Sequence, residues 1–110
     1  MTWNVLYTRH AELDLRGIYE HIAYSLLEPE IASKQSRRIM DAALSLEQIP
    51  LRFSLYDKEP WRSRGLRFMP VDNYLLFYLP DEEKATVTII RIMYGGRDIE
   101  KQLNDSREDK

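Results

Sequence analysis

The sequence lacks cysteine, has only four glycines, and contains no apolar run near the roughly 20 residues that cross a bilayer. The absence of cysteine excludes a disulfide scaffold, a thiolate zinc site, an iron–sulfur cluster and a cysteine nucleophile. The first residues also lack the basic-then-apolar order of a secretory signal. We therefore expect a cytoplasmic protein that does not associate with membranes.

An excess of charge of one sign is also missing, since 16 Lys and Arg stand against 18 Asp and Glu in 110 residues. The formal net charge of −2 gives no overall field that would attract nucleic acid, so any such contact would need a local basic patch. With 44% hydrophobic and 31% charged residues, the composition is that of an ordinary folded protein. The length fits one domain.

The N-terminal half has the pattern of a short strand followed by two helices. Residues 3–7 alternate as a strand does, and Thr8 suits the N-cap of a helix. Apolar residues then recur at helical spacing as far as Leu26. Pro29 suits the first turn of a second helix, which we expect to end near Pro50. The short link between the helices predicts an antiparallel hairpin.

The period of the pattern changes after Pro50. A loop over residues 51–64 precedes runs rich in β-branched and aromatic residues, which predict strands over Leu66–Val71, Tyr74–Leu79 and Thr86–Tyr94. The predicted order is β-α-α-β-β-β, an α+β fold with a helical hairpin on one face of a small antiparallel sheet. We expect one domain over residues 1–104 and a frayed polar tail over 105–110.

The predicted strand Tyr74–Leu79 is apolar on both faces. Two helices can cover one face, which leaves Leu75, Phe77 and Leu79 to be covered by something else. An outside partner, either another protein or a second copy of this chain, is one explanation. The other is that the loop over 51–64 and the C-terminal tail fold over this face.

The sequence offers no recognisable enzyme motif. His10 and His21 lie about three turns apart on the first predicted helix, too far to bind one metal ion. Gly95-Gly96 is a weak signal that is more typical of a turn than of a phosphate loop. No serine lies on a strand-to-helix turn of the nucleophile type. We expect no metal and no cofactor.

Arginines gather near the predicted strands and could form a basic patch at one end of the sheet, where guanidinium groups hold phosphate oxygens. They are Arg52, Arg62, Arg64, Arg67, Arg91 and Arg97. Trp61, Phe77 and Tyr94 could add stacking surfaces. The alternative is that the arginines are solvated loop charges or form ion pairs with acids on the helices.

Two stretches of this sequence resemble the RelE/ParE superfamily of bacterial toxins. They are residues 64–79, RGLRFMPVDNYLLFYL, and residues 87–98, VTIIRIMYGGRD. The early stretch over residues 11–22 and Ile49-Pro50 are similar to the family as well, so the resemblance covers nearly the whole chain. It implies the toxin of a type II toxin–antitoxin module, with two helices against a small sheet and a cognate antitoxin that covers the apolar face through Leu75, Phe77 and Leu79. A homodimer, or a heterotetramer with the antitoxin, is compatible with it.

The resemblance implies two different targets. RelE-like members cut messenger RNA on the ribosome without a metal, and the catalytic candidates here would be Arg67, Arg91, Tyr94 and Arg97. ParE-like members poison DNA gyrase, and the target-binding candidates would be Arg62, Arg64, Arg67 and Arg97.

Several positions where RelE-like nucleases carry basic or catalytic residues hold apolar ones here, namely Leu66, Phe68, Leu75 and Leu103. The phenylalanine–x–proline–valine pattern at Phe68–Val71 is closer to ParE. Gyrase is therefore the first expectation and the ribosome the second. A non-toxic relative that only binds an antitoxin is a third reading.

Overall fold

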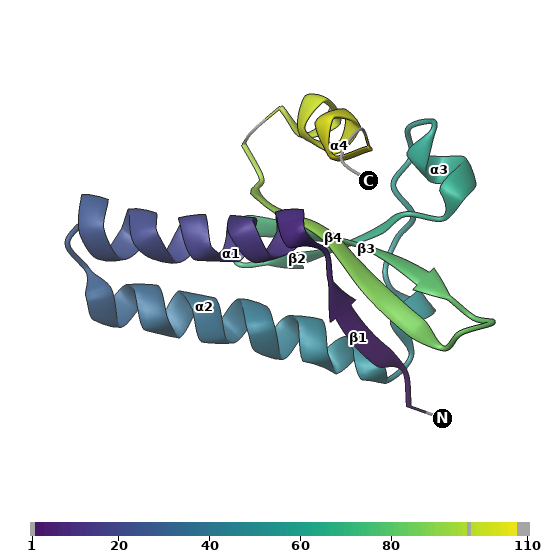
Figure 1. Ribbon diagram of the computed structural model, residues 1–110, viewed down its shortest axis with the longest axis horizontal. Helices are drawn as coiled ribbons and strands as arrows, with labels where there is room; N and C mark the ends of the chain where they lie inside the picture. Colours follow the sequence, from purple (N-terminus) through teal and green to yellow (C-terminus); the bar gives the residue numbers. More distant parts are fainter. Residues whose placement is uncertain (1, 97, 108–110) are drawn as a thin grey trace.

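The computed structural model describes residues 2–96 and 98–107 and has three layers (Figure 1). A hairpin of helices α1 (Arg9–Glu20) and α2 (Pro29–Leu44) forms the first layer. A four-stranded sheet forms the second. The short helix α3 (Trp61–Arg64) and the C-terminal helix α4 (Ile99–Arg107) lie beyond the sheet. No helix among the described residues is long and apolar enough to cross a membrane.

The sheet has the strand order β1-β4-β3-β2, where β1 is Asn4–Tyr7, β2 Arg67–Val71, β3 Tyr74–Asp81 and β4 Thr86–Tyr94. Strands β2, β3 and β4 form the predicted antiparallel meander. The α+β fold and the element order are as predicted, but β1 pairs parallel with β4, so the sheet is mixed where an antiparallel sheet was expected. Parallel pairing needs a long crossover, which the helical hairpin provides here.

Helix α1 starts at the predicted N-cap. The Thr8 hydroxyl accepts a hydrogen bond from the Ala11 amide at 3.0 Å and donates one to the Ile90 carbonyl at 2.9 Å. One side chain therefore fixes both the start of the helix and its position against β4. The helix continues into a π-helical turn, η1 (His21–Ser25), and Pro29 stands in the first turn of α2 as predicted. Helix α2 ends at Leu44 and a single 3₁₀ turn, η2 (Ser45–Glu47), follows.

The main core lies between the hairpin and the sheet. Its buried members come from both helices, from η2 and from β2, β3 and β4, and are Ala11, Ile39, Ala43, Leu46, Met69, Val71, Leu76, Tyr78, Val87, Ile89 and Ile92. The small residues Ala11 and Ala43 allow the helices to approach the sheet closely. Buried Tyr78 donates its hydroxyl to the Pro50 carbonyl and so anchors the chain that leaves the hairpin.

A second core lies on the opposite face of the sheet. Its buried members are Trp61, Leu66, Phe77, Met93 and Leu103. Of the two explanations that the sequence left open for this face, the structure shows the second in part, since α3, α4 and the loop before α3 cover this core. Leu103 inserts from α4, because the C-terminal segment forms an amphipathic helix rather than an irregular tail. Helix α4 runs to Arg107, and residues 108–110 of the expected frayed tail lie outside the described residues.

Candidate functional site

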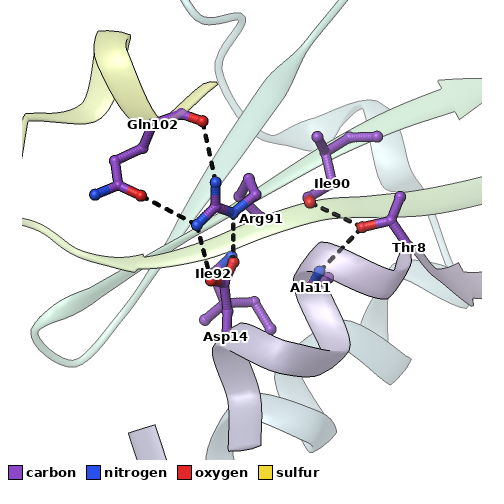
Figure 2. A network of polar contacts seen from close by, with 7 residues as sticks. All are labelled: Thr8, Ala11, Asp14, Ile90, Arg91, Ile92 and Gln102. Carbon is purple, nitrogen blue, oxygen red and sulfur yellow. Dashed lines mark hydrogen bonds and ion pairs between the residues drawn. The ribbon is translucent and has the colours of Figure 1, made fainter. Parts of the chain in front are cut away.

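Arg91, predicted to contact phosphate, is buried in an ion pair with Asp14 of α1 (Figure 2). Its Nε donates to Asp14 Oδ2 at 2.6 Å and its Nη2 donates to Asp14 Oδ1 at 2.9 Å. The Gln102 carbonyl and side-chain oxygen of α4 accept two more hydrogen bonds at 3.0 and 3.1 Å. In this arrangement the charge-assisted hydrogen bonds of the Arg91 guanidinium all go to the protein's own oxygen atoms, and its catalytic role stays a prediction.

Asp14, which sequence reasoning missed, organises this region. Strand β1 ends at Tyr7 opposite Ile89, which leaves the next backbone groups of β4 without a neighbouring strand. The Asp14 carboxylate takes the strand's place and accepts the Ile92 amide at 2.9 Å. A carboxylate between Leu13 and Leu15 and a lone arginine in an apolar strand were the available signals, since buried charges need a partner.

Arg67, the second predicted catalytic arginine, also has a structural task. Its Nη1 donates to the backbone carbonyls of Leu51, at 3.2 Å, and Phe53. These bonds hold the chain that follows the hairpin against the edge of β2, where Leu55 forms an isolated bridge with Arg67. Arg67 therefore stabilises a loop in this structure, and its role in catalysis or target binding stays a prediction.

The other described arginines of the predicted basic patch have contacts of their own. Arg64 lies over the Trp61 ring at 5.1 Å, and Arg52 lies over the Phe53 ring at 4.7 Å while donating to the Gln48 carbonyl. Arg62 is exposed on α3. Arg97 lies outside the described residues. Because Arg91 is buried between α1 and α4, the expected cluster of free guanidinium groups is not assembled in the described part of the chain.

A groove of about 820 Å³ occupies the half of the second sheet face that α4 leaves open. Its apolar lining comes from the sheet and the loop, and consists of Leu6, Leu51, Leu55, Leu79 and Ile90. Arg64 and Arg67 line it as well, together with Asp81, Glu82, Glu83 and Lys84 from the β3–β4 turn. With three acids beside three bases, this groove is suited to a protein segment rather than to a polyanion.

The three residues predicted to contact an antitoxin have different environments. Phe77 is fully buried in the second core, and Leu75 packs beside it as a half-buried residue. Leu79 packs at the margin of this core and also lines the open groove. The side chain of Phe77 is enclosed by the chain itself in this folded state, and its contact with an antitoxin stays a prediction.

Tyr94 lies at the end of β4 with 52% of its surface exposed, and its ring meets that of Tyr74 edge-on at 5.8 Å. Both line a groove of about 700 Å³ between the hairpin and the end of the sheet. Burial raises the pKa of Tyr74, and the neighbouring Tyr94 adds to this effect. Tyr74 is therefore fully protonated at neutral pH and is not poised as a base.

The described residues contain no group of three His, Asp or Glu able to hold a metal ion. His10 lies in the first turn of α1, and His21 is the first residue of η1. What the surface offers instead is apolar grooves with mixed charges, the chemistry of protein recognition.

Solved structures of bacterial and archaeal toxins share this fold. The chromosomal ParDE system of P. aeruginosa aligns with a TM-score of 0.69 and 24% identity, over 84% of this chain and 96% of that one. The RelBE2 complex of Mycobacterium tuberculosis gives 0.63 and 24%, over 86% and 92%. A mutant E. coli RelE in the free state gives 0.63 and 12%, over 99% and 97%. Comparison with curated proteins gave no match.

The sequence itself carries a family signature over most of its length. The family described as the ParE toxin of the type II toxin–antitoxin system, parDE, matches residues 5–99. These residues run from β1 to the start of α4 and include both helices of the hairpin and the whole sheet. The chain belongs to the ParE toxin family of type II toxin–antitoxin systems.

Proposed function

We propose that this protein is a toxin that inhibits DNA gyrase by binding it. The observation that supports this proposal is the occupation of Arg91 and Arg67, since both guanidinium groups hold the protein's own carboxylate or carbonyl oxygens. A toxin that poisons another enzyme needs a binding surface and no catalytic cluster. The match to the ParE family points in the same direction.

The ribosome-dependent nuclease remains the second candidate because the fold is shared with RelE. That reading requires Arg67, Arg91, Tyr94 and Arg97 to contact the scissile phosphate. The side chains of Arg67 and Arg91 donate hydrogen bonds to oxygen atoms of the protein itself. Tyr94, by contrast, is more than half exposed. A nuclease would lose cleavage and keep antitoxin affinity when Arg97 is replaced by Ala.

A cognate antitoxin is the partner that we propose for the open groove on the sheet. The P. aeruginosa and M. tuberculosis relatives were solved as toxin–antitoxin systems. An amphipathic segment could lay apolar side chains on Leu6, Leu79 and Ile90. Its acidic residues would face Arg64 and its basic residues would face the Asp81–Lys84 turn.

Expression in bacteria tests the function. Induction of the chain alone should stop growth, cause DNA breaks and block plasmid supercoiling, and co-expression of the antitoxin should restore all three. Growth arrest with intact supercoiling and truncated transcripts would favour the ribosome instead. Unimpaired growth at confirmed expression would indicate a non-toxic antitoxin-binding relative.

A further inference from the structure

The tip of the helical hairpin lies at the end of the molecule opposite the β3–β4 turn (Figure 1), and it exposes apolar side chains. Tyr24, Leu26, Leu27 and Ile31 are all more than half exposed there. Inside the tip, Ile22, Ala23 and Ala32 form a small buried cluster of their own. The tip is therefore a built element whose outer surface is apolar, and not an unfolded loop.

The backbone at the tip is unfavourable for the residue that occupies it. Helix α1 ends in a π-helical turn, and the Glu28 amide closes the end by bonding to the Ile22 carbonyl at 3.0 Å. Leu27 stands just before Glu28 in the left-handed conformation, with φ of 58°, a position that normally carries glycine or asparagine. A leucine pays a steric cost there that glycine does not.

No burial compensates for this cost within the chain. Leu27 is 77% exposed, the highest exposure among the large apolar side chains described. The presence of leucine at a position with an unfavourable backbone conformation and an exposed side chain is explained if a partner protein binds that side chain. π-Helical turns are frequent at such functional sites.

The charge around the tip indicates the chemistry of that partner. Residues 17–33 include three glutamates and no lysine or arginine, although the chain has 16 basic residues. Glu20 pairs with Arg16 at 3.4 Å, which leaves Glu28 and Glu30 as the acids that rim the tip. All three glutamates are exposed. An apolar tip with an acidic rim is complementary to an apolar pocket edged by basic side chains. Enzymes that hold DNA have surfaces rich in basic groups, because they must neutralise phosphates.

We propose that the hairpin tip, centred on Leu27, is the element that docks into the inhibited protein, in an apolar pocket with a basic edge. This inference rests on the proposed function and specifies which surface meets the target. The tip projects away from the groove assigned to the antitoxin, which lies on the other side of the sheet near the β3–β4 turn. Target and antitoxin would then use separate surfaces.

Leu27→Asn tests the proposal, since asparagine accepts the left-handed conformation and removes the apolar contact. Leu44→Asn, at an exposed leucine at the far end of α2, is the matched control. We expect Leu27→Asn to unfold at an equal or higher urea concentration than the parent and to bind antitoxin equally. Its affinity for immobilised gyrase should fall about tenfold or more, the loss expected of an anchor side chain. Leu44→Asn should bind gyrase as the parent does.

Glu30→Lys tests the charge argument independently of the backbone. It should weaken gyrase binding and reduce its salt dependence, whereas Asp41→Lys, at an exposed acid of α2 away from the tip, should leave both unchanged. Unchanged gyrase affinity in both tip variants, with a parent that poisons gyrase, would overturn the docking proposal and leave the proposed function standing. If the parent does not bind gyrase, the proposed function fails. Growth inhibition then tests the docking proposal by itself. Full toxicity of Leu27→Asn would overturn that proposal, and lost toxicity with intact antitoxin binding would support it.

Discussion

Asp14 and Arg91, 77 residues apart in sequence, meet in two hydrogen bonds of 2.6 and 2.9 Å between α1 and β4. The Asp14 side chain is 15% exposed and the Arg91 side chain 10%, so the ion pair is largely shielded from solvent. Because Gln102 accepts from the same guanidinium, the pair also ties α4 to the body of the protein. This relationship explains why the most central arginine of the chain is not part of its binding surface.

Asp14→Asn should destabilise the protein by about 3–5 kcal/mol, since it leaves a buried guanidinium without its counter-charge. The exposed pair Arg16–Glu20 is the control, and Glu20→Gln should cost less than about 1 kcal/mol. Urea unfolding of both variants measures the difference. Equal losses would show that the buried pair contributes no more than an exposed one.

Tyr78→Phe should cost about 1–3 kcal/mol, because the Pro50 carbonyl then loses its buried donor. A pH dependence accompanies this bond. Burial raises the pKa of Tyr78 from 10.0 to about 12, so the folded state holds the phenolic proton more tightly than the unfolded state. The contribution of this pKa shift to the free energy of unfolding is fully present below pH 10 and is lost as the pH rises toward 12. Urea unfolding from pH 8 upward should show this loss in the parent and a smaller one in Tyr78→Phe. The same pH dependence of the free energy of unfolding in both proteins would show that Tyr78 is not its source.

Arg67→Gln should destabilise the protein by about 1–3 kcal/mol and speed proteolysis within residues 51–64, because two carbonyls lose a charged donor. Arg62→Gln, at an exposed residue of α3, is the control and should change neither quantity. Limited proteolysis with mass spectrometry identifies the cleaved bonds. A loop equally protected in both variants would return Arg67 to the list of candidate target contacts.

Leu79→Asp should weaken the antitoxin complex at least about tenfold while the isolated toxin stays folded, since Leu79 is only half-buried. Phe77→Asp should instead unfold the toxin, because it places a charge in the second core. Met40→Asp, on the helical face of the molecule, should leave antitoxin affinity unchanged. Calorimetric titration with circular dichroism separates these outcomes. Undiminished affinity of Leu79→Asp would place the antitoxin elsewhere.

Local patterns in the sequence were sufficient for the hairpin and the meander. The structure confirms the element order predicted from Thr8 at an N-cap, Pro29 in a first turn and three β-rich runs. Each of these signals depends only on residues that are neighbours in the sequence. The helix that carries Leu103 was not predicted, because the few apolar residues of this segment give no clear helical period.

Long-range pairing could not be predicted in the same way. The parallel pairing of β1 with β4, the Asp14–Arg91 pair and the cover over Phe77 all join residues distant in sequence. The candidate site was the hardest part to predict, since the sequence alone does not distinguish an exposed arginine from a buried, ion-paired one. Leu27 could not be identified either, because its left-handed backbone is visible only in three dimensions.

The most direct test of the account is a cleavage assay with purified bacterial gyrase, ATP, supercoiled plasmid and the isolated chain. After detergent and protease treatment, linear DNA should accumulate with increasing toxin, and an equimolar amount of antitoxin should prevent it. The account is contradicted if active gyrase yields no linear DNA and supercoils the plasmid at its normal rate in the presence of folded toxin.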